Sequence, residues 1–159
     1  MTNSPEPINS NQIPESLPKT NYPEPFKALM NDRIKRKLGN HFGLSNFGVN
    51  LTTLQCGGMS ALKHCHSHQD EFIYIIEGTV TLIYGDREYV MNEGDCMGFK
   101  AGENTAHQLV NKSSGIVTYL EIGDRSANDE VTYPDDDLAG KFNENGKWQF
   151  LHKNGEPYS

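Results

Sequence analysis

The sequence has no long apolar run. None of its 159 residues belongs to a stretch near the roughly 20 consecutive apolar residues that a membrane-spanning helix requires. Its first residues, MTNSPEPINSNQ, have neither the basic segment nor the apolar segment of a secretory signal. We therefore expect a cytoplasmic protein with no membrane partner.

Cysteine is also scarce. The chain has three cysteines, Cys56, Cys65 and Cys96, and no two of them form a CxxC pair. An odd number of cysteines without paired spacing argues against a disulfide framework and fits reduced thiols in the cytoplasm. We interpret all three side chains as small residues of the core.

Positive charge is in short supply. The chain has 14 Lys and Arg against 21 Asp and Glu, which gives a net charge of −7. Because an acidic chain repels phosphate backbones, we expect no nucleic-acid partner. The one basic cluster consists of Arg33, Lys35, Arg36 and Lys37, and we interpret it as the solvated face of a helix in preference to an anion site.

Composition divides the chain into three parts. Residues 1–39 hold most of the eight prolines and few apolar residues, which is typical of an extended arm, and a short helical turn could begin near Pro25. Residues 40–125 have the pattern of strands. Residues 126–159 include the only tryptophan, Trp148, and we expect a tail that packs on the middle part.

The middle part has the pattern of an all-β domain. Phe47, Val49 and Leu51 alternate with small or polar residues, which is the period of a half-buried strand. Residues 72–76 form a continuous apolar run, and Gly85 with Asp86 marks the turn of a hairpin. Short strands separated by glycine turns, with no amphipathic helix of note, predict one β-sandwich or β-barrel.

Candidate metal ligands lie between the first strands of this domain. His64 and His66 are two residues apart, so on a strand both imidazoles project from the same face. Glu71 follows after a short turn, and its carboxylate can return to that face from the next strand. Two imidazoles and one carboxylate on one side of a metal form a facial triad with open positions opposite. His107, which begins a later strand, is the natural fourth ligand.

The spacing of these residues resembles the first signature motif of the cupin superfamily. Every fixed position of that motif is matched, by Gly58, His64, His66, Glu71 and Gly78. The second motif is matched in part: Lys100 replaces a proline, and His107 comes two residues later than the family spacing.

This resemblance covers roughly residues 40–125 and implies a fold. Cupins form a double-stranded β-helix, or jelly-roll, barrel in which three histidines and one glutamate hold a metal ion. The chain is thus expected to be such a barrel with an extended N-terminal arm and a C-terminal tail. Small single-domain members are often dimers, so the resemblance also implies a homodimer.

Other residues could complete the site. Ile73 and Ile75 share strand parity with Glu71 and are expected to line the pocket. Glu121 lies on an apolar strand and is a candidate acid or base if it faces the cavity, whereas a paired or solvent-facing carboxylate is the alternative.

Two residues near the histidine pair have less defined roles. His68 shares parity with His66 and is a second candidate acid or base, although its place near a turn favours an exposed position or a supporting role over ligation. Asp70 could orient a ligand imidazole, but an exposed acid in a turn is the simpler interpretation.

The ligand set leaves three mechanisms open. Three imidazoles and one carboxylate suit one divalent transition metal, Zn, Mn, Fe, Ni or Co. Such a site could polarise a carbonyl or hydroxyl for isomerase or lyase chemistry, support a dioxygenase, or bind a small molecule without reaction. Our first hypothesis is a metal-dependent enzyme acting on a small polar or sugar-like molecule. The alternative is a non-catalytic small-molecule-binding or sensing protein.

Overall fold

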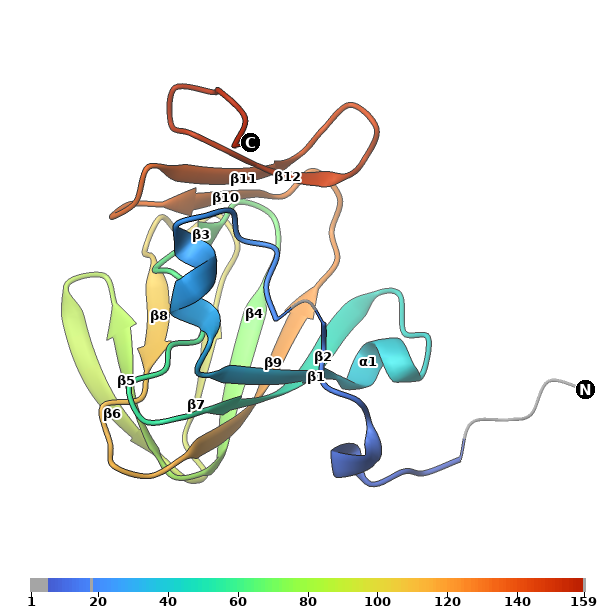
Figure 1. Ribbon diagram of the computed structural model, residues 1–159, viewed down its shortest axis with the longest axis vertical. Coiled ribbons are helices and arrows are strands. Elements are labelled where there is room, and N and C mark those ends of the chain that lie inside the picture. Colours follow the sequence, from blue (N-terminus) through green and yellow to red (C-terminus); the bar gives the residue numbers. More distant parts are fainter. Residues whose placement is uncertain (1–5, 18, 159) are drawn as a thin grey trace, which may run out of the picture.

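The structure of the chain is a computed structural model that describes residues 6–17 and 19–158. These residues form twelve strands and only short helices (Figure 1). The helices are two 3-10 turns at Ser10–Gln12 and Phe26–Met30 and one α-helix, α1, at Leu38–His41. The strands are β1 (Arg33–Lys37), β2 (Phe47–Leu54), β3 (Cys65–His66), β4 (Glu71–Glu77), β5 (Thr79–Tyr84), β6 (Arg87–Asn92), β7 (Cys96–Phe99), β8 (His107–Val110), β9 (Val117–Asp124), β10 (Glu130–Tyr133), β11 (Leu138–Phe142) and β12 (Trp148–Leu151).

Two walls of strands enclose the core. One wall is a five-stranded sheet in the order β1-β2-β9-β4-β7. The other consists of the sheets β6-β5-β8 and β12-β11-β10-β3, which meet where His64 and His107 exchange backbone hydrogen bonds of 3.1 and 2.8 Å. Apolar side chains from both walls, among them Ile75, Leu82 and Leu109, fill the space between them. The predicted all-β, jelly-roll barrel is confirmed.

Strand β1 corrects the interpretation of the basic cluster as a helix face. Residues Arg33 to Lys37 pair antiparallel with β2, so that Arg33 lies opposite Leu54 and Lys37 opposite Asn50. Alternate side chains of a strand share one face, so Arg33, Lys35 and Lys37 all project to the interior side of the sheet. The predicted helix is wrong because the edge of β2 offers backbone partners that the local sequence does not reveal.

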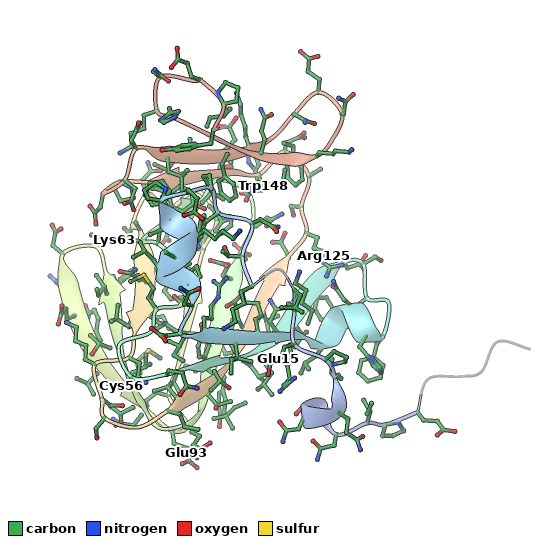
Figure 2. The ribbon with its side chains drawn as sticks, in the orientation of Figure 1. Glu15, Cys56, Lys63, Glu93, Arg125 and Trp148 are labelled. Carbon is green, nitrogen blue, oxygen red and sulfur yellow. The ribbon has the colours of Figure 1, made fainter. Side chains whose placement is uncertain are left out.

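The tail extends one wall of the barrel. Strand β10 pairs with β3, with Val131 opposite His66, and β11 and β12 continue the same sheet at the top of Figure 1. A second apolar cluster, which includes Tyr133 and Leu138, packs beneath these strands against Trp148, labelled in Figure 2. The tail therefore lies beside the candidate ligand His66.

The N-terminal arm crosses the edge of the barrel. The arm's Ser16 N–H donates to the carbonyl of Lys35 at 2.8 Å, and the Arg36 guanidinium donates to the carbonyl of Ile13 at 2.8 Å. The 3-10 turn at Phe26–Met30 begins after Pro25, near the place where the sequence predicts a helical turn.

The three cysteines lie nearer the surface than the sequence predicts. All three thiols are free, but Cys56 and Cys96 are exposed and only Cys65 is partly buried, so the core assignment is wrong for the first two. No helix in the described part of the chain is long and apolar enough to cross a membrane.

Candidate metal centre

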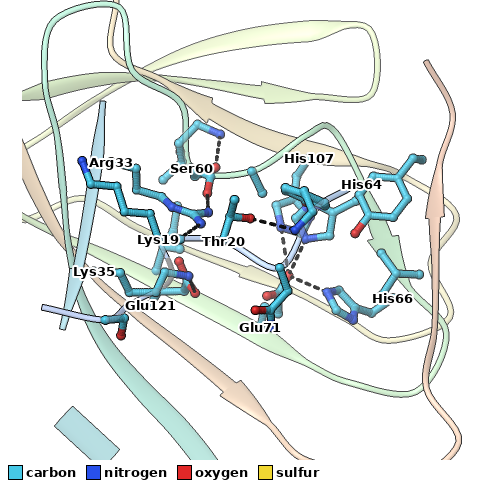
Figure 3. A pocket seen from close by; sticks show the side chains of 18 of the residues that line it. Lys19, Thr20, Arg33, Lys35, Ser60, His64, His66, Glu71, His107 and Glu121 are labelled. Atoms are coloured by element: carbon cyan, nitrogen blue, oxygen red, sulfur yellow. Dashed lines mark hydrogen bonds and ion pairs between the residues drawn. The ribbon is translucent and has the colours of Figure 1, made fainter. Parts of the chain in front are cut away.

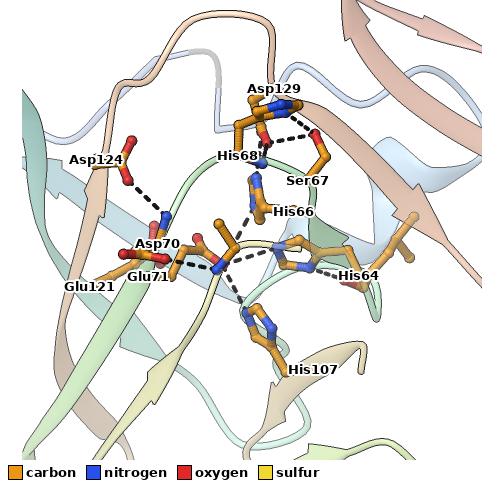
Figure 4. A network of polar contacts seen from close by, with 12 residues as sticks. His64, His66, Ser67, His68, Asp70, Glu71, His107, Glu121, Asp124 and Asp129 are labelled. Carbon is orange, nitrogen blue, oxygen red and sulfur yellow. Dashed lines mark hydrogen bonds and ion pairs between the residues drawn. The ribbon is translucent and has the colours of Figure 1, made fainter. Parts of the chain in front are cut away.

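Four predicted ligands meet at one point inside the barrel. His64 immediately precedes β3, His66 ends it, Glu71 begins β4 and His107 begins β8. The Nε2 atoms of the three imidazoles lie 3.6, 3.5 and 2.9 Å from the same oxygen, Oε2 of Glu71, in the order His64, His66, His107. Figure 4 shows the three rings converging on this carboxylate from three directions.

The donor set fits a metal ion. One ligand atom each from His64, His66 and Glu71 lies within 4.8 Å of the others, which is the span of a single coordination sphere. Oε2 of Glu71 is buried, and among the described residues it has no partner of hydrogen-bonding geometry. Since an unsatisfied buried carboxylate oxygen is costly, a cation at this point would offset that cost.

Hydrogen bonds on the far side of two rings set their tautomers. Nδ1 of His64 lies 2.7 Å from the carbonyl of Leu62, which can only accept, so Nδ1 carries the proton. Nδ1 of His66 lies 2.6 Å from Oδ2 of Asp129, a carboxylate oxygen that accepts its proton. In both rings the Nε2 lone pair is left free toward Glu71, as a metal ligand requires.

Asp129 is the residue that sequence reasoning missed. It lies in the tail immediately before β10, is 1% exposed, and its Oδ1 also accepts the backbone N–H of His68 at 2.9 Å. Asp70 was the sequence's alternative for this role, but it is exposed, as its simpler interpretation as a turn acid expects, and it accepts the N–H of Ala101 at 2.7 Å. Sequence separation hides the pairing, because Asp129 reaches His66 only through the β3–β10 ladder.

The electrostatics of the cluster favour an ionised carboxylate at Glu71. Burial raises the pKa of Glu71, but the close imidazoles of His107, His64 and His66 outweigh burial and hold that pKa well below its usual range. Burial lowers the pKa of His107. Burial also acts to lower the pKa of His66, yet the Asp129 contact reverses this and raises it.

A cavity of about 270 Å³ extends from the four candidate ligands. Strands of both walls, the tail and the arm all contribute to its lining (Figure 3). Ile73 lines it as expected from its parity, whereas Ile75 is fully buried in the core cluster and is not among the described lining residues.

The two candidate acids or bases differ in position. Glu121 lines the cavity, and its Oε1 accepts hydrogen bonds from Lys35 at 2.7 Å and from Asn50 at 3.2 Å. The side chain of His68 is exposed beside Ser67, 2.7 Å from its hydroxyl, and is not among the described residues that line the cavity. Of the two, only Glu121 is placed to meet a molecule bound beside the four candidate ligands.

Comparison with known proteins agrees with this geometry. Residues 50–123 match the cupin domain family. The chain is similar over 97% of its length to 97% of a sugar phosphate isomerase from a cupin superfamily of Silicibacter pomeroyi, with 35% identity and a TM-score of 0.89. No curated protein matches the chain.

Two further solved structures are more distant. A protein from Acidithiobacillus ferrooxidans, provisionally described as a sugar phosphate isomerase, shares 29% identity over 77% of both chains with a TM-score of 0.70. The polyketide cyclase from Streptomyces resistomycificus shares 17% identity over 75% of this chain and 78% of its own, with a TM-score of 0.61, and supports the fold alone.

Proposed function

The chain belongs to the cupin superfamily, and from this premise we propose that it is a mononuclear metal enzyme of isomerase type that acts on a small sugar-like molecule. The observation that carries the proposal is the position of Glu121, a partly buried carboxylate in the same cavity as the four converging donors. A second carboxylate beside the ligands supplies the proton acceptor that isomerisation requires.

The proposed ligands are His64, His66, Glu71 and His107. When bound, a divalent Zn, Mn, Fe, Ni or Co ion supplies Lewis acidity to a carbonyl or hydroxyl oxygen of the substrate. Oε2 of Glu71, which is buried without a partner of hydrogen-bonding geometry, and the two imidazoles anchored through Nδ1 support this assignment.

Glu121 is the proposed base. Sugar isomerisation moves a proton between adjacent carbons, and a carboxylate within reach of both carbons can accept it from one and return it to the other. Lys35 and Asn50 both hold Oε1, which fixes the side chain and leaves Oε2 for the substrate proton. Tyr22 and Tyr133 also line the cavity, burial raises the pKa of both hydroxyls, and as neutral groups they can donate to substrate hydroxyls.

The aromatic lining and the relatives support a sugar-like substrate. Tyr133, Trp148 and Phe150 line the cavity and offer flat apolar faces to the C–H side of a sugar ring. The two relatives described as sugar phosphate isomerases share 35% and 29% identity with this chain, so their chemistry is a reasonable starting point for assays.

Solvent exchange tests the proposal directly. The full chain, loaded with each of the five metals in turn, is incubated with a panel of aldoses and ketoses and their phosphates in D₂O, and deuterium incorporation next to the carbonyl is followed by NMR. Glu121→Gln should lower the exchange rate about 10²-fold or more, the usual contribution of a positioned base, with metal content unchanged. The matched control is Glu88→Gln, since Glu88 also pairs with a lysine, Lys112, at 2.7 Å but lies outside the cavity.

The exchange assay, with substrate binding and dioxygen uptake measured on the same metal-loaded samples, decides between this function and the others. Exchange that survives Glu121→Gln would remove Glu121 from the mechanism. Substrate binding without exchange at any metal would favour the binding or sensing protein, and dioxygen uptake with iron would favour a dioxygenase.

A homodimer and a cytoplasmic location stay predictions. The homodimer has support from the outer face of the five-stranded sheet, where Phe47, Phe72, Tyr74 and Ile76 are 43, 38, 41 and 39% exposed. Light scattering on the purified chain measures its mass in solution and tests the dimer.

A further inference from the structure

One end of the cavity is strongly basic. Four cationic residues line it: Lys19, Arg33, Lys35 and Lys37. The whole chain has only 14 Lys and Arg and a net charge of −7, so nearly a third of its cations gather at one cavity. The described lining residues include only two carboxylates, Glu71 and Glu121. Such a concentration of one sign of charge in a cavity attracts ligands of the opposite sign.

Arg33 is buried there without a carboxylate partner. It is 7% exposed, and its guanidinium donates to the carbonyl of Ser60 and, at 2.8 Å, to the carbonyl of Lys19. No carboxylate in residues 6–17 or 19–158 lies within ion-pair distance of it, and its Nε is buried with no hydrogen-bond partner. A buried cation balanced only by carbonyl dipoles is costly, and an anionic ligand would offset that cost.

Two more polar groups beside Arg33 lack partners. The hydroxyls of Thr52 and Tyr119 are buried, and within the described chain neither has a hydrogen-bond partner. Thr52 lies opposite both Lys35 on β1 and Tyr119 on β9 in the strand register, on the face that Arg33 shares. Of the three residues, Arg33 and Tyr119 line the cavity, where a polar ligand could satisfy them, and Thr52 lies beside Tyr119 in the sheet.

We propose that this basic end binds the phosphate group of a phosphorylated substrate, through Lys19, Arg33 and Lys35. Arginine and lysine are the residues that bind phosphate most effectively, by charge-assisted hydrogen bonds. The four cations outnumber the two carboxylates by two charges. A dianionic phosphate balances this surplus better than a carboxylate, which carries one negative charge. Figure 3 shows Arg33 and Lys35 at the opposite side of the cavity from His64 and His66. A substrate anchored here by its phosphate extends toward the metal ligands.

The N-terminal arm completes this subsite. Lys19 belongs to the arm, and its carbonyl accepts from Arg33 while its Nζ donates to the carbonyl of Asn31 at 2.9 Å. The arm residues Thr20 and Tyr22 line the same cavity. The proline-rich segment is therefore part of the substrate site. The phosphate subsite rests on the proposed function in one respect only, namely that the sugar-like part of the substrate reacts beside the metal ligands.

Calorimetric titration of inorganic phosphate into the metal-loaded full chain tests the subsite. Lys19→Met and Lys35→Met should each weaken phosphate binding about tenfold or more, the loss of one charge-assisted hydrogen bond. The matched control, Lys112→Met, removes an exposed lysine paired with Glu88 and should leave the affinity unchanged. Arg33→Lys keeps the charge but loses the planar fork, and its thermal melt reports whether the buried change is tolerated.

Two results of the titration would overturn the subsite. They are the absence of saturable phosphate binding, and binding that all lysine variants leave unchanged, which would place phosphate on the metal. Glu121→Gln separates this inference from the proposed function, since it should stop proton exchange while phosphate still binds. Where exchange occurs with a phosphorylated sugar, inorganic phosphate should raise the apparent KM without changing kcat. Phosphate binding without such competition would indicate a site for free phosphate and would refute a substrate subsite.

Discussion

Replacing Asp129 by asparagine isolates the tail's contribution to the candidate metal centre. The carboxylate of Asp129 holds Nδ1 of His66 at 2.6 Å and the backbone N–H of His68 at 2.9 Å. Asparagine has the same shape but only one accepting oxygen. If that oxygen keeps the backbone N–H, the amide nitrogen faces Nδ1 of His66 and donates to it. The ring proton then moves to Nε2, the atom that faces Glu71, and the ring can no longer ligate.

The magnitude follows from this change of tautomer. Loss of the group that orients a metal-ligating histidine costs about 10- to 100-fold in metal affinity. This corresponds to about 1.4–2.8 kcal/mol of binding free energy. The side chain is 1% exposed, so water cannot take over the lost hydrogen bond.

The assay is competition for Zn²⁺ between the protein and a chelating dye at neutral pH. Asp137→Asn is a close control, because Asp137 also accepts from a histidine Nδ1, that of His152 at 2.7 Å, and from a backbone N–H, that of Lys153 at 2.8 Å, but lies outside the metal centre. Equal Zn²⁺ affinities for Asp129→Asn, Asp137→Asn and the unmodified chain would refute the role of Asp129.

Three further predictions concern metal content, backbone strain and pH. His68→Ala should keep its metal by elemental analysis, because the side chain is exposed; a large loss would show that it ligates. Gly78→Ala should lower the free energy of unfolding by about 2 kcal/mol or more, since φ is 84° and the new Cβ would overlap the carbonyl oxygen of Ile116. Gly94→Ala, with φ 88° and no atom within 4 Å, should cost less in the same denaturation assay, and equal costs would show that the overlap is relieved. The His152 contact lowers the pKa of Asp137, so its stabilisation is complete above the unfolded pKa and lost as pH falls through the folded one. The difference in unfolding midpoint between the unmodified chain and Asp137→Asn should therefore shrink below about pH 4, and a constant difference would contradict this.

Local patterns predicted the strands well but not always the side that faces inward. Residues 72–76 are a continuous apolar run, and the structure buries only Ile73 and Ile75 of β4. In β2 the fully buried residues are Thr52 and Leu54, whereas Phe47 is 43% exposed. Alternation gives the period of a strand, but the pairing register decides which parity points to the core.

The sequence by itself determined the centre of the candidate site. His64, His66 and Glu71 lie within eight consecutive residues, so the two-residue period of a strand and one short turn are enough to bring them together. Their convergence needs little information from elsewhere in the chain.

Only the tertiary structure decided the surroundings of that centre. Asp129 is 63 residues from His66, and Lys35 is 86 residues from Glu121, yet each pair is in contact. The basic cluster became the wall of a cavity because β1 pairs with β2 along its whole length. Such contacts depend on which strands pair and in which register, and this is settled by burial and backbone hydrogen bonding across the whole barrel rather than by any local pattern.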